Sequence, residues 1–249
     1  MLDTDIILIA TGAFLLGGFV KGVVGLGLPT VSLAILTATV GLKEAMVLML
    51  FSSFVTNAWQ ALVGGHLIAI LKRLWTFLAV GAVGIWIATG WLAKSDAVLL
   101  SGVFGGLLFL YGAISLFGKP LPPPGRAEIW LTPSVGGVAG IITGLTGSFT
   151  VPGIMYLQSL GMTKDVFVQA MGVVFTMSTL TLSISLAAND LVPKNLGLMS
   201  VAGLLPAALG MIAGQRIRNK LSEAQFRRVF FASLLFVGFY IAMRAFVKI

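Results

Sequence analysis

Long apolar runs separated by short polar breaks make up most of the chain. Several of the runs are close to the roughly 20 residues that an α-helix needs to cross a bilayer. Two of the breaks contain little more than Lys43-Glu44 and Lys164-Asp165. The pattern predicts an all-α polytopic membrane protein with about eight hydrophobic segments. They lie at residues 6–40, 45–63, 74–93, 97–117, 132–160, 165–187, 195–215 and 229–247.

The composition supports a membrane protein and disfavours several other classes. The chain is 58% hydrophobic and 10% charged, whereas a soluble domain has about 25% charged residues. It has no Cys, and His66 is the single histidine, so we expect no metal, no cofactor and no intramembrane enzyme. The net charge of +8 comes without a polybasic tail, so orienting loops explain it better than nucleic-acid binding does. Residues 1–5 carry two acids and no base, so we expect no signal peptide.

Two of the apolar runs are interrupted by glycine and proline, and their motifs resemble each other. The first reads GFVKGVVGLGLP (residues 18–29) and the second GIITGLTGSFTVP (residues 140–152). Their glycines recur at a constant offset, which indicates an internal duplication. The alternative is that a chain with 31 glycines aligns with itself by chance. We predict a first transmembrane repeat at 1–117, a Pro-rich linker at 118–131 and a second repeat at 132–249.

Each interrupted run predicts a broken, re-entrant pair of half-helices, because 132–160 is too long for one span and too short for two. Each half then crosses three times, and the halves are inverted. With the N-terminus outside, this arrangement puts ten bases in the cytoplasm and five outside, whereas the best parallel arrangement gives eight against seven. The ten are Lys72, Arg73, Lys119, Arg126, Lys164, Arg216, Arg218, Lys220, Arg227 and Arg228; the five are Lys43, Lys94, Lys194, Arg244 and Lys248.

Two explanations of the glycine-proline motifs stay open. Small residues at this spacing allow helices to pack closely in lipid. Alternatively, unwound backbone and half-helix N-termini expose N–H groups, and two such breaks facing each other would form a cradle for an anion. The candidate binding residues of this kind are Gly22, Gly25, Gly27 and Pro29 in the first motif, and Gly144, Gly147 and Pro152 in the second.

Lys21 favours the binding-site explanation. A charge at the bilayer centre costs roughly 2.5–3.5 kcal/mol on insertion scales and usually has a function. The acidic residues of the chain lie in loops or at the N-terminus, so we expect an anionic substrate to supply the opposite charge. The alternative is that Lys21 snorkels to an interface along its own aliphatic stem. Thr143 occupies the matching position in the second motif.

Further polar side chains fall within the apolar runs. Asn57, Gln60 and Gln169 are costly to bury in lipid, so we predict that they line the transport pathway. Thr143, Thr146 and Ser148 lie inside the second motif and are candidate substrate contacts. The alternative for each is a hydrogen bond that holds two helices together.

These motifs carry a family resemblance. GGFVKGVVGLGLP, GLTGSFTVPGIMYLQSLGM and the C-terminal GMIAGQRIRNKLSEAQFRRVFFASLLFVGFYI are similar to the sulfite exporter TauE/SafE family, and the likeness covers nearly the whole chain. Many members have a triple glycine in each motif. This chain has Gly25-Leu26-Gly27 and Gly147-Ser148-Phe149 instead, which leaves the substrate open.

The resemblance implies a permease of the bacterial inner membrane. It implies export of sulfite or a small organosulfonate by alternating access, with the lipid bilayer and a small anion as partners, and it leaves a homodimer open. Import of another organic or inorganic anion stays an alternative. A second alternative is a membrane scaffold or assembly protein that transports nothing. Lys21 and the paired breaks would then lack a purpose.

Overall fold

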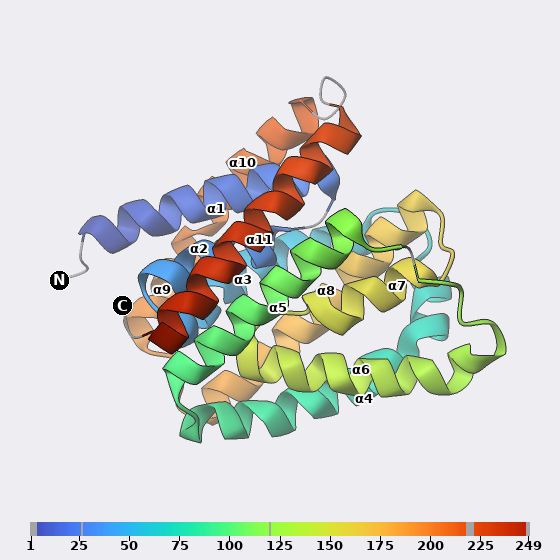
Figure 1. Cartoon of the computed structure of the whole chain (residues 1–249), viewed down its shortest axis with the longest axis horizontal. Coiled ribbons are helices and arrows are strands. Elements are labelled where there is room, and N and C mark those ends of the chain that lie inside the picture. The colour runs from blue at the N-terminus through green and yellow to red at the C-terminus, as the bar shows by residue number, and fades with distance from the viewer. Residues whose placement is uncertain (1–3, 26, 120, 218–221, 248–249) are drawn as a thin grey trace. The chain divides into compact units, whose positions relative to one another are not determined.

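The computed structural model describes residues 4–25, 27–119, 121–217 and 222–247. These residues form helices and no strand, as the apolar pattern predicts (Figure 1). Leu26, Pro120, Arg218, Lys220 and Lys248, which enter the sequence-based predictions, lie outside the described residues. The α-helices are α1 (Thr4–Val24), α2 (Leu28–Thr39), α3 (Leu42–Leu62), α4 (Leu67–Lys94), α5 (Ala97–Phe117), α6 (Glu128–Thr146), α7 (Met155–Ser159), α8 (Lys164–Ala188), α9 (Lys194–Ala202), α10 (Leu204–Ile217) and α11 (Glu223–Val247).

Eight helical segments in the described part of the chain are long and apolar enough to cross a membrane. Six are single helices: α1, α3, α4, α5, α8 and α11. The seventh joins the 3₁₀ turn η1 (Gly125–Ala127) to α6, and the eighth is Asn195–Ile217, which contains α9 and α10. The prediction of a polytopic α-helical membrane protein with about eight hydrophobic segments is therefore confirmed.

Several helix boundaries differ from the apolar runs: α6 and α11, for example, begin before the runs at 132–160 and 229–247. α4 begins at Leu67 and so includes Lys72 and Arg73, because charged side chains with long apolar stems are compatible with the end of a membrane helix. The run at 195–215 divides at Gly203 into α9 and α10. A side chain at Gly203 would collide with the ring of Phe14.

The described residues cluster into two compact units, and each unit combines separate stretches of the chain. The first comprises Met1–Ser52, Ser95–Lys119 and Val192–Ile249; the second comprises Ser53–Lys94 and Pro120–Leu191. Within the first unit, α1 packs along α10 and α5 packs along α11. Within the second, α4 packs on α6 and α8 (Figure 1).

Glycines allow the closest of these helix pairs to form. A side chain at Gly18 or Gly22 of α1 would collide with the backbone of α10, at Ala207 and Met211. In the second unit, a side chain at Gly140 of α6 would collide with the carbonyl of Gly81 on α4. Close backbone approach of this kind is typical of membrane helices, where small residues increase the van der Waals contact between helices.

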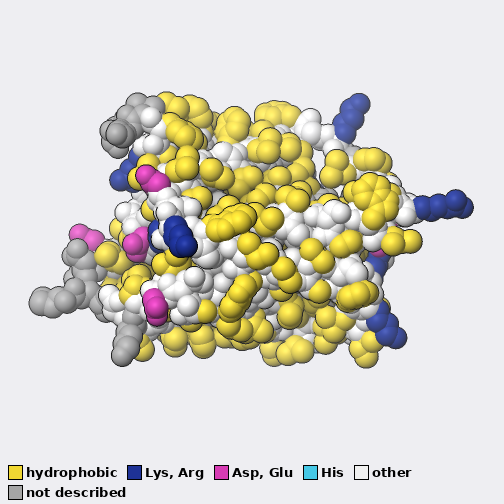
Figure 2. Space-filling view, turned by 90° about the horizontal axis from the view of Figure 1, so that it is seen from below, with side chains coloured by type: hydrophobic (Ala, Val, Ile, Leu, Met, Phe, Trp, Pro, Cys, Tyr) yellow, Lys and Arg dark blue, Asp and Glu magenta, His cyan; other side chains and the backbone are white. Residues whose placement is uncertain are grey.

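The surface carries the large apolar side chains that a lipid environment requires. Leu8, Trp59, Trp75 and Ile129 are each more than 60% exposed. Hydrophobic side chains cover most of the face drawn in Figure 2, and charged side chains gather near its left and right edges. A soluble monomer rarely exposes apolar patches of this extent, so the surface agrees with a membrane protein.

Candidate functional site

The first glycine-proline motif builds a break between two helices. α1 ends at Val24, and Gly25 follows in the left-handed conformation with φ +86°. The N–H of Gly25 donates to the carbonyl of Lys21 at 2.7 Å, which caps the end of α1. Gly27 has φ +118°, and Pro29 lies in the first turn of α2, where its missing N–H costs nothing. Each glycine and proline of the break thus has a local structural reason.

The second motif ends its helix in the same way. α6 ends at Thr146, Gly147 has φ +69°, and its N–H donates to the carbonyl of Thr143 at 2.7 Å. A π-helical segment, η2 (Thr150–Ile154), then leads into α7, and the Val151–Pro152 peptide is cis. Gly25 and Gly147 are the positions that the sequence repeat matches, so the prediction of a break in both motifs is confirmed.

The helix before each break is longer than the half-helix that the sequence predicts. α1 has 21 residues and α6 has 19, which corresponds to roughly 30 Å each. Each is part of a segment long enough to cross the hydrocarbon core. The helices that follow are short, with 12 residues in α2 and five in α7. The breaks therefore follow full-length helices and precede short ones.

Lys21 lies in the last turn of α1 and is only 3% exposed. A positive charge at this end of a helix interacts favourably with the helix dipole. Lys21 also has an interaction in addition to the backbone bond from Gly25, so its burial does not by itself require a ligand. Burial does show that Lys21 is not an ordinary surface cation, because a charge inside a membrane protein is expensive.

Four hydroxyl side chains gather at the second break: Thr143, Thr146, Ser148 and Thr150. All four are at least 97% buried. The Thr143 hydroxyl donates to the carbonyl of Ala139 at 2.7 Å and to that of Ser148 at 3.3 Å. The hydroxyls of Ser148 and Thr150 lie 2.9 Å apart, and Thr146 accepts from the N–H of Ser148 at 3.3 Å. The structure thus brings three of the predicted residues together.

Thr150 belongs to this cluster although the sequence analysis did not single it out. Its signal was its place inside the second motif, two residues before Pro152. Hydroxyl groups can both donate and accept hydrogen bonds. The cluster can therefore exchange its internal bonds for bonds to the oxygens of an anion.

Phe149 lies between Ser148 and Thr150 of this cluster in the sequence, and its side chain is buried. Its ring makes edge contacts with the rings of Phe77 and Phe175, with centroids 5.7 Å apart in each pair. A cavity that Phe149, Phe77 and Ile85 help to line has a volume of only about 10 Å³, which is about enough for one water molecule. An oxyanion could enter this cavity only if Phe149 or its neighbours moved.

For the predicted site residues Gly22 and Gly144, the structure supplies a packing role. A side chain at Gly22 would collide with the carbonyl of Met211, and one at Gly144 would lie 2.6 Å from the carbonyl of Ile85. Helix packing was the alternative that the sequence left open, and it accounts for both glycines. Gly25, Gly27 and Gly147 form the breaks themselves.

Gln60 and Gln169 hold α3 and α8 together. The Gln60 side chain donates to the carbonyl of Val168 at 2.6 Å. Gln169 donates to the carbonyl of Ala61 at 2.8 Å and accepts from the N–H of His66 at 2.9 Å. Asn57 is 1% exposed and also has an interaction partner. The alternative for these residues was a hydrogen bond that holds two helices together. Gln60 and Gln169 both form such bonds, between α3 and α8.

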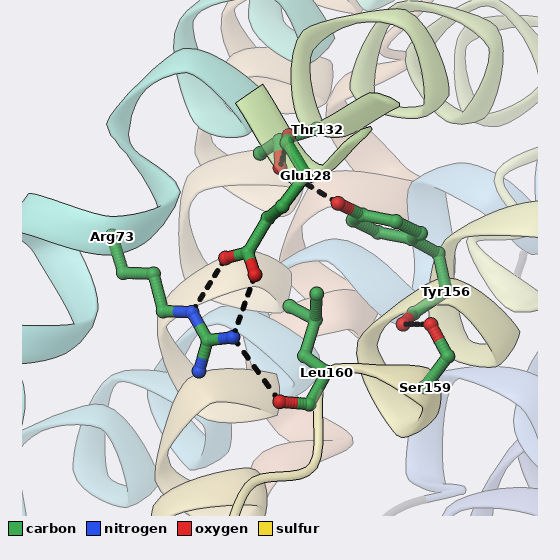
Figure 3. A network of polar contacts seen from close by, with 6 residues as sticks. All are labelled: Arg73, Glu128, Thr132, Tyr156, Ser159 and Leu160. Atoms are coloured by element: carbon green, nitrogen blue, oxygen red, sulfur yellow. Dashed lines mark hydrogen bonds and ion pairs between the residues drawn. The ribbon is translucent and has the colours of Figure 1, made fainter. Parts of the chain in front are cut away.

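An ion pair that the sequence analysis missed fixes the second broken segment (Figure 3). Arg73 on α4 donates to both carboxylate oxygens of Glu128, at 2.6 and 2.9 Å. It also donates to the carbonyl of Leu160, which follows α7, at 3.1 Å. Arg73 therefore joins α4 to the start of α6 and to the end of α7.

A second contact lies beside this pair and joins the same two segments. The Tyr156 hydroxyl of α7 lies 2.7 Å from the hydroxyl of Thr132 on α6, as Figure 3 shows. Thr132 in turn donates to the carbonyl of Glu128 at 2.6 Å. The two contacts together link both ends of the segment that contains the hydroxyl cluster.

A comparison with protein families gives a match. The family model described as Sulfite exporter TauE/SafE matches residues 9–241. This region includes both breaks, Lys21 and the hydroxyl cluster. No match was found among the curated proteins or among the solved structures.

Proposed function

Because the chain belongs to the sulfite exporter TauE/SafE family, we propose that it is a secondary transporter that exports sulfite or a small organosulfonate. The observation that carries this proposal is the family match over residues 9–241, which covers almost all of the eight candidate spans. The multi-pass membrane architecture is the one that a permease needs.

The helix packing inside each unit supports alternating access between repeats. α1, which carries the first motif, packs on α10, and α6, which carries the second, packs on α4. The spacing of Gly84 and Gly112 recurs in Gly210 and Gly238, so α4 and α10 are themselves matched by the repeat. Each motif helix thus packs on the matched helix of the other half, as two inverted repeats would do.

We assign anion binding to the residues of each break. The first break supplies Lys21 as a buried cation, together with the unwound backbone from Gly25 to Pro29. The second supplies the four hydroxyls and the unwound backbone from Gly147 to Pro152. A charge and several hydroxyl donors are the groups that an oxyanion with little apolar surface requires.

The membrane potential can drive this transport. Moving a negative charge out of a cell that is negative inside is favourable by about 2.3 kcal/mol per 100 mV, so a uniporter needs no ion gradient. The proposal places the protein in the bacterial inner membrane with its N-terminus outside, as the distribution of Lys and Arg favours.

Efflux of radiolabelled sulfite from proteoliposomes tests the proposal. Vesicles that contain the protein should lose sulfite or a small sulfonate faster than empty vesicles, and unlabelled substrate outside should accelerate the exchange. Efflux of sulfite, sulfonates and other small anions at the rate of empty vesicles would contradict a transporter and favour the scaffold alternative. If only an unrelated anion leaves the vesicles, the protein is still a transporter, but sulfite and sulfonates are not its substrates.

A further inference from the structure

A larger cavity lies in the first compact unit, and none of its lining residues belongs to the breaks at Gly25–Pro29 and Gly147–Pro152. Its volume is about 480 Å³. The end of α2, the start of α5 and the end of α11 form it, and Arg244 is its only charged lining residue among those described. The other lining residues are Thr37, Ala38, Thr39, Val40, Gly41, Val98, Ser101, Ile241 and Ala245.

We propose that this cavity binds the phosphate group of an anionic phospholipid. Arg244 donates to the carbonyl of Ala38 at 2.6 Å, which fixes the guanidinium at the cavity. A guanidinium carries five N–H donors, and this bond uses one of them. The remaining donors match the oxygens of a phosphate, which arginine binds with well-defined geometry.

One further group suits an anion in this cavity. Thr37 is 6% exposed, and its hydroxyl has no hydrogen-bond partner among the described residues. A buried hydroxyl without a partner is costly, so a ligand that reached Thr37 would gain by satisfying it.

The two acidic residues nearest in sequence to the lining residues each lie at the start of a helix. Asp96 accepts from the N–H groups of Val98 and Leu99 and so caps α5. Glu44 lies close to Gly41 at the start of α3, where the helix dipole stabilises a carboxylate. Neither is among the described residues that line the cavity, and Lys43, which precedes Glu44, donates to the carbonyl of Ser95 at 3.2 Å.

Size and surroundings favour a lipid over a free oxyanion. A cavity of about 480 Å³ lies in the range of sites for ligands much larger than sulfite. Its wall includes Val98, which is 53% exposed, and the neighbouring Phe246 is 67% exposed. Acyl chains can lie against such exposed apolar side chains while the phosphate remains beside Arg244.

Native mass spectrometry of the full-length protein in detergent tests the proposal. The probes are phosphatidylglycerol and phosphatidylcholine with identical acyl chains. We expect the protein to retain phosphatidylglycerol preferentially, and Arg244→Ala to weaken that retention about five-fold, as the loss of one basic contact predicts. The control Arg216→Ala removes an exposed charge from the last turn of α10 and should leave retention unchanged.

A second variant keeps the test decisive if Arg244→Ala fails to fold. Val98→Trp adds bulk to the cavity wall without removing the Arg244–Ala38 bond, and it should also reduce retention. Wild-type retention of phosphatidylglycerol by both variants would overturn the proposal. Displacement of the lipid by millimolar phosphate or sulfite would also overturn it, because the cavity would then be a site for free anions. Lipid retention is measured without flux, so its failure leaves the transport proposal standing.

Discussion

Arg73 binds both carboxylate oxygens of Glu128, and the two residues lie 55 positions apart in the sequence. The same guanidinium reaches the carbonyl of Leu160, so one side chain fixes α4 against both α6 and the end of α7. This joins the ends of the broken segment that contains the hydroxyl cluster. The geometry of that break therefore depends on the contacts of Arg73 with Glu128 and Leu160, which lie at the two ends of the segment.

Replacing Arg73 by Ala should loosen the second break. Because the pair is partly exposed, we expect a loss of about 1 kcal/mol in stability, or about 2–4 °C in melting temperature, together with slower transport. Thermal unfolding in detergent measures the first and vesicle efflux the second. Lys72→Ala, at the exposed neighbouring position, is the matched control. Stability effects of Arg73→Ala and Glu128→Ala that simply add in the double variant would contradict the coupling.

Gly22 and Gly12 lie on the same helix and provide a test of packing against binding. A side chain at Gly22 would collide with α10, whereas nothing lies within 4 Å of one at Gly12. Gly22→Ala should therefore lower the melting temperature and the yield of monodisperse protein, and Gly12→Ala should leave both unchanged or slightly higher, because alanine favours helix. If Gly22→Ala kept full stability and lost only transport, Gly22 would be a substrate contact.

Thr143 connects the two sides of the second break through its hydroxyl. Thr143→Val removes the bonds to Ala139 and Ser148 while keeping a side chain of similar shape. We expect a stability cost of about 1 kcal/mol and a several-fold rise in KM for sulfite, and Thr143→Ser should restore the KM. The control is Ser134→Ala, at an exposed position where the hydroxyl donates to the carbonyl of Trp130 in its own helix. An unchanged KM in Thr143→Val would remove Thr143 from the binding site.

Phe149 should control access to the hydroxyl cluster. The chain has no cysteine, so a Ser148→Cys variant reports access through its labelling rate with a thiol reagent. We expect slow labelling in this variant and faster labelling when Phe149→Leu is added, because the smaller side chain loosens the packing at the residue next to Ser148. Lys119→Cys, an exposed position, should label at the same rate in both backgrounds. Equal rates at Ser148→Cys would show that Phe149 does not limit access.

The sequence predicted features that depend on local composition. Hydrophobic runs located the spans, because lipid requires continuous apolar surface. Gly25, Gly147 and Pro29 marked the breaks, since left-handed turns and missing N–H groups are properties of single residues. The same reasoning could not give the length of α1 before its break, because the apolar run continues past Val24 without a change in composition.

Features that depend on distant contacts were not predictable in this way. Arg73 and Glu128 lie in different polar breaks, and nothing in either break specifies the other as a partner. Gln169 was a candidate for the pathway because of its polarity, yet its partners Ala61 and His66 lie more than 100 positions away. Gly22 fits packing and binding equally well in the sequence, where its contact with α10 cannot be seen. The sequence thus identified the candidate residues but could not assign their roles.

The most direct test of the account is sulfite flux driven by a potassium diffusion potential in proteoliposomes, measured for the wild type, Lys21→Met and Lys21→Arg. Lys21→Met keeps a long side chain and removes the buried charge, and Lys119→Met is the control at an exposed position. We predict flux out of the negative compartment that rises with the potential, falls at least ten-fold in Lys21→Met and is partly retained in Lys21→Arg. Undiminished flux in a folded Lys21→Met protein would contradict the assignment of the buried cation to the transported anion.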